Sequence, residues 1–422
     1  MTLPSRIGSS VRAIHHGSRG RPVGYSTRYT REVDPLRGIC DWLTAGAPGT
    51  STAPEVLVYL GEGIRTAGIP IERVGLFVAT MHPSIGGRGF IWTPGQPVDL
   101  REVPYDVMAS DAFGKSPIMV VARSKTEIRR HLELPDCPRD YPIFEDFANE
   151  GVTDYIALPL VFVTGEGHTV TLTTKVKGGF TDAQLDALRN LLKPLARLVE
   201  IFALRRTAAT LLSTYVGHNS GERILRGHFR RGDIEDIRAV IWFSDLRGFT
   251  EMSTTRTPRE IIDVLNEVFD CQVLPIHKRG GEVLKFIGDA VLAIFPIVGG
   301  EAETTVAERA IDAALEAQKN LRVRNGELGT SLRFGLALHL GEIAYGNIGS
   351  VSRLDFTAIG PAVNLASRLE GLAGKLGRPI VLSSEMARLT QRKLETLGEF
   401  DLKGVPGKQS AYAPQLPAAE EK

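Results

Sequence analysis

Cysteine, net charge and long apolar runs are all scarce in this 422-residue chain, and each scarcity excludes a class of protein. Three widely spaced cysteines (Cys40, Cys137 and Cys271) do not make a disulfide framework or a zinc site. A net charge of +1 leaves no overall field that attracts nucleic acid or an anionic membrane. No apolar run is long enough to span a bilayer, and no signal-peptide core follows Met1. We therefore expect a reduced, cytoplasmic protein with no membrane span and no nucleic-acid partner.

The length predicts two or three domains. Residues 1–35 are rich in Arg, Gly and Ser and are expected to form a flexible arm. An apolar-periodic α/β region, residues 36–204, follows, and its last two strands are separated by the hairpin signal at 163–167. Strands are expected at 74–79, 89–92, 155–162 and 168–173.

A long helix is expected to begin after Thr181, because Thr181 and Gln184 have the spacing of a capping box. Its apolar stripe continues toward Leu212, with Arg and Lys interleaved, which favours a dimer seam over a membrane helix. The stripe consists of Leu185, Leu188, Leu192, Leu195, Leu198 and then Ile201 or Phe202. Residues 205–236 are assigned to a helical linker, with a polar connection over 217–232.

Strands and helices alternate strongly in residues 237–415, ahead of a short tail at 416–422. A helix is predicted to begin at Pro258 with Thr257 as its cap, and another with Thr305 as cap and Glu308 three residues on. Strands are expected at 239–243, 283–287, 290–295 and 332–338, and a further helix at 361–372.

Two aspartates stand at the ends of apolar strands in this region. Asp245 follows the strand 239–243, and Asp289 lies in a Gly-Asp pair between two strands. Taken singly, the first is typical of a helix cap and the second of a tight turn. The alternative is a shared metal site, because two carboxylates that lie close together repel unless a cation sits between them.

Three further side chains fit the same chemistry. Lys285 lies inside an apolar strand. It is either an edge-strand lysine that discourages aggregation or a donor to a bound base. Asn364 and Arg368 share a helix face at i, i+4 spacing. Arg368 either pairs with an acid such as Glu370 or Asp355, or offers a planar cation to a phosphate.

As a set, these residues resemble the class III nucleotide cyclases, the adenylyl and guanylyl cyclase family. The resemblance rests on five blocks in family order, which together are far more specific than one motif. The blocks are 243–250 (FSDLRGFT), 281–290 (GEVLKFIGDA), 333–341 (RFGLALHLG), 346–349 (GNIG) and 356–370 (FTAIGPAVNLASRLE).

This resemblance implies a ferredoxin-like βαββαβ catalytic domain in an α+β protein. It implies two Mg²⁺ or Mn²⁺ ions per active site, held by Asp245, Asp289 and the backbone carbonyl of Leu246. The other residues it implies are Lys285 and Thr357 for the base, Asn364 for the ribose, Arg368 for the transition state, Lys403 for the triphosphate, and the segment Leu246, Arg247, Gly248, Phe249 and Thr250 for the substrate phosphates. The site would lie at a homodimer interface, with Asn364 and Arg368 supplied by the second subunit.

Lys285 favours ATP over GTP, because guanylyl cyclases typically carry Glu at this position and a lysine would leave the guanine N1–H without an acceptor. Many adenylyl cyclases carry Asp where this chain has Thr357, whose hydroxyl still accepts a hydrogen bond. Pro361 departs from the family pattern but suits a first helical turn. We expect an adenylate cyclase; the alternatives are a guanylate cyclase or a catalytically silent nucleotide-binding module.

Residues 36–204 resemble a GAF-type sensor, through the last strand pair, the segment 179–184 (GFTDAQ) and the long helix. His82 and His168 are candidate ligands of a haem or a metal ion, although a lone histidine is more often structural. Trp92 and Tyr155 are expected in the core. A small-molecule or protein signal, unidentified by the sequence, would shift how two catalytic halves meet.

Overall fold

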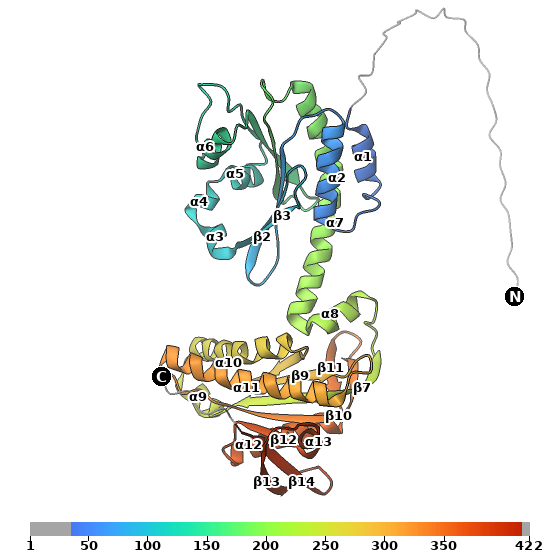
Figure 1. The fold of residues 1–422 in the computed structure, drawn as a ribbon, viewed down its shortest axis with the longest axis vertical. Helices are drawn as coiled ribbons and strands as arrows, with labels where there is room; N and C mark the ends of the chain where they lie inside the picture. The colour runs from blue at the N-terminus through green and yellow to red at the C-terminus, as the bar shows by residue number, and fades with distance from the viewer. Residues whose placement is uncertain (1–34, 416–422) are drawn as a thin grey trace, which may run out of the picture.

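The structure, a computed structural model, describes residues 35–415 and contains two β-sheets connected through a long helix, α7 (Asp182–Val216) (Figure 1). The predicted tail and all but Pro35 of the predicted arm lie outside the described residues. Within the described range, no helix has the length and apolarity needed to cross a bilayer.

The first sheet is antiparallel throughout, with the strand order β3-β2-β1-β6-β5-β4. The four strands expected from the sequence are confirmed, and the hairpin at 163–167 joins β5 to β6. The strands are β1 (Arg73–Ala79), β2 (Ile85–Trp92), β3 (Asp99–Pro104), β4 (Ile128–Arg130), β5 (Asp154–Val161) and β6 (Gly167–Thr174).

Helices pack around this sheet in two groups, each with its own apolar cluster. One cluster joins α1, α2 and the first half of α7 to the sheet and includes Trp92. The other joins α5 and α6 to β5 and includes Tyr155, so both aromatic residues lie in the core as predicted. The helices are α1 (Arg37–Thr44), α2 (Ala53–Thr66), α3 (Tyr105–Ala109), α4 (Asp111–Gly114), α5 (Pro117–Ser124) and α6 (Pro142–Asn149).

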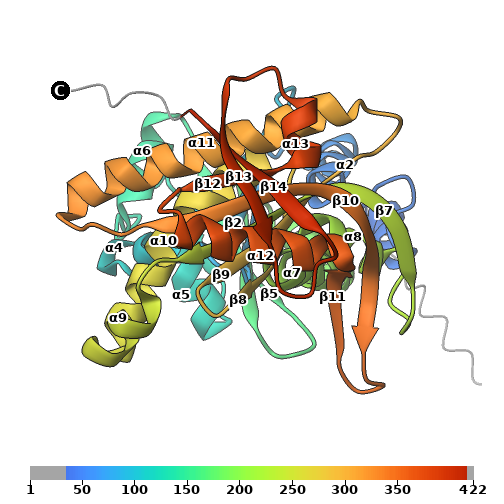
Figure 2. The same ribbon diagram turned by 90° about the horizontal axis from the view of Figure 1, so that it is seen from below.

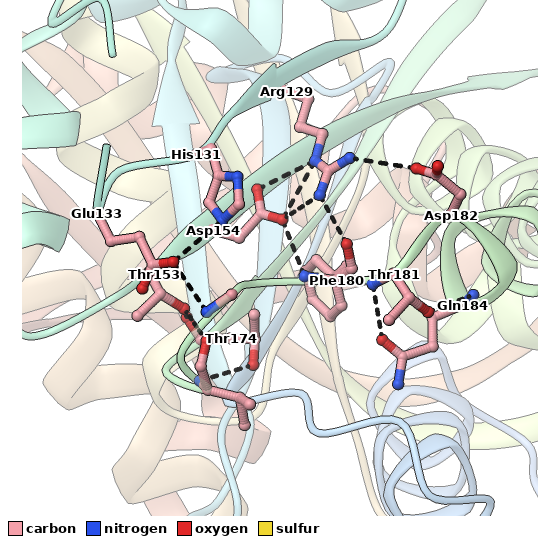
Figure 3. A network of polar contacts seen from close by, with 12 residues as sticks. Arg129, His131, Glu133, Thr153, Asp154, Thr174, Phe180, Thr181, Asp182 and Gln184 are labelled. Atoms are coloured by element: carbon pink, nitrogen blue, oxygen red, sulfur yellow. Dashed lines mark hydrogen bonds and ion pairs between the residues drawn. The ribbon is translucent and has the colours of Figure 1, made fainter. Parts of the chain in front are cut away.

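A polar network fixes the loop that leads into α7 (Figure 3). Asp154, fully buried, accepts hydrogen bonds from Arg129 Nη2 at 2.7 Å and from the backbone N–H of Phe180 at 3.0 Å. Arg129 also donates to the Phe180 carbonyl at 2.7 Å. Beyond this loop, Thr181 and Gln184 form the predicted capping box. The start of α7 is therefore bound to the sheet through a buried ion pair as well as through its cap.

The leucine stripe predicted as a dimer seam is instead part of the core of the N-terminal domain, so that prediction is wrong for the first half of α7. Leu185, Leu188, Leu195 and Leu198 are at most 5% exposed and pack with α1, α2 and the sheet. The periodicity identified an apolar face correctly, but the partner of that face is the chain's own sheet.

The second sheet contains the fold expected for the C-terminal domain. Its order is β13-β14-β12-β10-β7-β9-β8, with β11 paired to β10. The order β10-β7-β9-β8, with helices after the first and third of these strands in sequence, is the ferredoxin-like βαββαβ arrangement. The strands are β7 (Ile234–Leu246), β8 (Glu282–Ile287), β9 (Ala290–Pro296), β10 (Phe334–Gly349), β11 (Leu354–Ile359), β12 (Ile380–Ser383), β13 (Leu394–Asp401) and β14 (Lys408–Pro414).

Strand alternation sends neighbouring residues of β7 to opposite faces of this sheet. Val240 and Trp242 pack with α10 and α11, whereas Ala239 and Ile241 pack with α12. Figure 1 shows α10 and α11 on one side of the sheet and α12 on the other, and Figure 2 shows α12 beside the β13–β14 hairpin. The helices are α8 (His218–Leu225), α9 (Phe249–Thr255), α10 (Pro258–Lys278), α11 (Glu303–Leu328), α12 (Pro361–Lys375) and α13 (Ser384–Leu389).

One local prediction in this half is wrong, and one is confirmed. The Thr257–Glu260 capping box is present at the start of α10. In contrast, α11 begins at Glu303 after Ala302, so Thr305 lies inside its first turn, and Glu308 accepts a hydrogen bond from Arg392. The predicted helical linker, residues 205–236, contains the end of α7 and the short helix α8.

A buried polar junction attaches α8 to the second sheet. Glu282, 3% exposed, opens β8 and accepts hydrogen bonds from the backbone N–H of Ser220 at 2.9 Å and from its hydroxyl at 2.7 Å. The Tyr345 hydroxyl in β10 donates to the other Glu282 oxygen at 2.8 Å. The junction leaves no room at Gly217, where an added Cβ would lie 2.8 Å from Glu282 Oε1.

Candidate active site

The two aspartates of the predicted metal site lie next to each other. Asp245 lies near the end of β7, in register with Ala290, the first residue of β9. Asp289 precedes Ala290 in the β8–β9 turn, so antiparallel pairing brings the two carboxyls together at one end of the sheet. Asp245 is therefore a strand residue rather than a helix cap, and it lies on the face of β7 that α12 covers.

The electrostatics of this pair fit a bound cation. Burial and then the neighbouring Asp289 raise the pKa of Asp245 from its usual 3.8 to about 6. No cluster of three or more Asp, Glu, His or Cys side chains suited to a metal ion occurs within residues 35–415. Two carboxylates suit Mg²⁺, which usually takes one or two protein carboxylates and completes its shell with water and substrate phosphates.

The segment after Asp245 turns sharply before it becomes helical. Gly248 has φ +74°, a left-handed conformation that favours glycine, and α9 begins at the next residue. Leu246 is buried in the core, while Phe249 packs against it from the edge. Thr250 is exposed. Binding of phosphates by this segment remains a prediction.

Lys285 makes an ion pair that the sequence did not assign to it. Its ammonium contacts Asp355 Oδ2 on β11, which joins the edge strand β8 to the β10–β11 ribbon. Thr357, 7% exposed, lies two residues further along β11 and so on the same face of the strand as Asp355. The two predicted base-selecting positions thus lie on strands connected by the Lys285–Asp355 pair.

Asn364 and Arg368 are exposed on α12, and within the described residues Arg368 has neither an ion pair nor a side-chain hydrogen bond. The proposed partners of Arg368 are already taken, because Asp355 pairs with Lys285 and Glu370 pairs with Arg247. Lys403 is exposed in the β13–β14 turn, and β14, β12 and β10 separate β13 from β7. These three residues form no hydrogen bond or ion pair with the aspartates within residues 35–415.

Sequence reasoning missed the buried acid Glu370. The residue is 5% exposed, and its Oε1 lies 2.8 Å from Arg247 Nη1. Burial raises the pKa of Glu370 from 4.5 to about 7; Arg247 opposes this shift, while Asp245 and Asp289 add to it. Glu370 ends the fifth matched sequence block, but nothing in that block indicates burial or a partner directly after β7.

In the N-terminal domain, His168 is a packed core residue. Its Nδ1 accepts a hydrogen bond from the Ala79 N–H at 3.2 Å, and its ring lies 4.0 Å from that of Phe162 between centroids. Burial lowers the pKa of His168. His82 lies in the β1–β2 loop, where Nδ1 accepts from the Ser84 N–H. These contacts suit the structural hypothesis for both residues.

Comparison with known proteins bears on the C-terminal part of the chain. Residues 235–414 match the family model described as "Adenylate and Guanylate cyclase catalytic domain". The adenylate cyclase of Anabaena cylindrica is 34% identical over 152 residues, which are 36% of this chain and 30% of that protein. The solved adenylyl cyclase CyaB from P. aeruginosa is 27% identical, with a TM-score of 0.41, over 45% of this chain and 99% of that one. The guanylyl cyclase Cya2 is 28% identical, with a TM-score of 0.38, over 44% and 96%.

Residues 235–414 therefore belong to the class III nucleotide cyclases, which confirms the family predicted from the five sequence blocks. The chain spans 30% and 27% of the length of the first two curated relatives, both named as adenylate cyclases. The description of the family model names both adenylate and guanylate cyclases, so the family leaves the choice between ATP and GTP open. The GAF-type assignment of residues 36–204 stays a prediction.

Proposed function

We propose that this protein is an adenylate cyclase, which converts ATP to 3′,5′-cyclic AMP and pyrophosphate at sites shared by two copies of the chain. The observation that carries the proposal is the apposition of Asp245 and Asp289, with the raised pKa of Asp245. Two carboxylates that repel each other at this short separation suit a pair of divalent cations bound to a triphosphate.

ATP is the proposed substrate because of the charge at position 285. Asp355 holds the Lys285 side chain at the β8–β11 junction, where an ammonium donates to a base nitrogen that lacks a proton, such as N1 of adenine. Thr357, on the same face of β11, offers a hydroxyl that accepts from the adenine amino group. The Anabaena cylindrica relative, named an adenylate cyclase, is consistent with this choice.

In the proposed reaction, the ribose 3′-hydroxyl attacks the α-phosphorus in line and pyrophosphate leaves. Divalent cations held by Asp245 and Asp289 would supply charge neutralisation and a lower pKa for that hydroxyl. Asn364 orients the ribose, and Arg368 stabilises the charge that grows on the phosphate. No side chain is assigned as general base, so the proton passes to water or to a substrate phosphate.

Two copies are proposed because Asn364 and Arg368 form no hydrogen bond or ion pair with the aspartates of their own chain within residues 35–415. The exposed apolar stripe on the second half of α7 supports such a dimer. Ile201, Leu204, Leu211 and Tyr215 are 53%, 61%, 39% and 81% exposed, and with exposed Ala208 they alternate three and four residues apart. This spacing is the a/d pattern of a parallel coiled coil. The proposed seam therefore lies C-terminal to the stripe predicted from the sequence.

Disulfide trapping tests the seam. Leu204→Cys and Leu211→Cys should give disulfide-linked dimers under mild oxidation, because facing d positions bring Cα atoms within disulfide range. Arg206→Cys, on the outer face of the same helix, is the matched control and should stay monomeric on a non-reducing gel. Equal crosslinking at all three positions would refute a seam on this stripe.

The activity itself is tested by incubating the purified protein with ATP or GTP and Mn²⁺ and identifying the products by chromatography. The proposal predicts cyclic AMP as the main product and no product from the Asp289→Asn variant. Mainly cyclic GMP would make the protein a guanylate cyclase. No cyclic nucleotide from either substrate would support the silent nucleotide-binding module. An absorption spectrum of the same sample tests for haem in the N-terminal domain, for which a regulatory role is proposed.

A further inference from the structure

Arg247 crosses from the strand that carries Asp245 to the helix that carries Asn364 and Arg368. Its Nη1 lies 2.8 Å from Glu370 Oε1, and its Nη2 donates to the Glu370 carbonyl at 3.4 Å. The Glu370 side chain is 6% exposed and that of Arg247 26% exposed, so the pair is largely shielded from solvent. Removing one partner of a buried pair costs more than removing one partner of a surface pair, because it leaves a buried charge uncompensated.

Two glycines make the path of the Arg247 side chain possible. A Cβ added at Gly335 of β10 would lie 1.5 Å from Arg247 Nη2, and one at Gly374 of α12 would lie 2.8 Å from Nη1. Neither glycine has a left-handed backbone, so conformation does not require it. The space they leave is filled by the guanidinium, which is therefore enclosed between β10 and α12 on its way to Glu370.

The Arg247–Glu370 pair also interacts electrostatically with the two aspartates. Arg247 lowers the pKa of Asp245 through its charge, and Asp245 and Asp289 both act on Glu370. Three carboxyls and one guanidinium thus interact across the gap between β7 and α12. Glu370 lies two residues after Arg368 on α12, so a shift of this pair changes the position of the helix relative to the aspartates.

We propose that Arg247 and Glu370 are positioning residues that couple the two active sites of a dimer. The inference rests on the proposed function, in which each site takes its aspartates from one chain and its α12 residues from the other. Within one chain, Arg247 then belongs to the metal side of one site, and Glu370 to the helix that serves the other site. The ion pair holds these two half-sites in a fixed relation.

The first test compares Glu370→Gln with Glu267→Gln. In the control, the same substitution removes the ion pair between Glu267 and Arg324, which joins α10 to α11 on the opposite face of the sheet. Glu370→Gln should lower kcat about 10- to 100-fold with little change in KM, as loss of a supporting partner around a metal site typically does. Arg247→Lys, which keeps the charge, should recover part of the activity lost in Arg247→Met. The control should keep wild-type kcat.

The second test uses mixed dimers with one working site, made from an Asp245→Asn chain and an Arg368→Ala chain with different tags. The working site takes its aspartates from the Arg368→Ala chain and α12 from the Asp245→Asn chain. Glu370→Gln in either chain should lower kcat of that site, because the pair reaches it from β7 in one chain and from α12 in the other. An effect from only one chain would overturn the coupling.

A third measurement does not depend on activity. Hydrogen exchange of α12 amides should quicken in Glu370→Gln while that of α10 stays unchanged. Unchanged α12 exchange, or unchanged kcat with only a lower Tm, would show a structural contact and overturn the proposal. If the wild-type protein makes no cyclic nucleotide, but Glu370→Gln still changes the exchange of α12, the proposed function is refuted and the Arg247–Glu370 contact between β7 and α12 is retained.

Discussion

Asp245→Asn should abolish turnover and, at the same time, stabilise the metal-free protein at pH 8. Removing one of two apposed carboxyls removes their mutual repulsion, and Asn keeps the size of the side chain. The pKa of Asp245 rises from 3.8 to about 6, chiefly through burial and then through Asp289. A raised pKa in an acid means that the native state is favoured below pH 3.8 and loses that advantage as the pH rises through about 6.

The magnitude follows from the shift. At about 1.4 kcal/mol per pKa unit, the full pKa shift of Asp245 corresponds to about 3 kcal/mol in the free energy of unfolding. Asp245 is only partly buried, so solvent screening reduces this to about 1 kcal/mol. In a domain of this size, such a gain raises Tm by about 2–4 °C.

Thermal unfolding in EDTA at pH 4 and at pH 8 is the assay, with Asp236→Asn as the control. Asp236 is exposed on the same strand β7 and has no ion pair in the part of the chain that the structure describes. The gain from Asp245→Asn should be present at pH 8 and largely absent at pH 4, and the control should show neither. A lower Tm for Asp245→Asn at pH 8 in EDTA would refute the electrostatic account of the site.

Other substitutions test the remaining parts of the molecule. Arg368→Ala should lower kcat far more than it raises KM for ATP in a steady-state assay, because its exposed guanidinium acts on charge that develops during reaction; equal effects on both would argue for ground-state binding. Lys285→Glu should lower cyclic AMP formation and raise the ratio of cyclic GMP to cyclic AMP, since Glu accepts from the guanine N1–H; an unchanged ratio would remove Lys285 from base selection. Arg129→Met should destabilise the protein by about 3–5 kcal/mol in denaturant unfolding, because fully buried Asp154 loses its cation; a loss below about 1 kcal/mol would contradict a strong buried pair.

Features that depend on neighbouring residues could be predicted from the sequence. The capping boxes at Thr181 and Thr257 and the β8–β9 turn at Asp289 each involve a few consecutive positions, and all three are present. The start of α11 was misplaced because Thr305 and Glu308 have the spacing of a capping box, while the real boundary has no side-chain cap.

Features that depend on distant partners could not be predicted. The stripe along Leu185–Leu198 has the spacing expected of any buried helix face, and only the tertiary structure shows that the face is covered by the chain's own sheet. The partner of Lys285 lies 70 residues away in β11, and the carbonyl that accepts from Arg247 lies 123 residues away in α12. Burial, and not residue type, makes Glu370 part of the site.

The junction of Ser220, Glu282 and Tyr345 has a mechanical consequence. Glu282 is the first residue of β8, Lys285 is the fourth, and Asp289 follows in the turn at the end of the same strand. The three hydrogen bonds converge on a carboxylate that is 3% exposed, and an added Cβ at Gly217 would lie 2.8 Å from it. Because this one carboxylate accepts hydrogen bonds from α8 and from β10, the junction fixes α8 to the start of the strand that carries Lys285 and ends before Asp289.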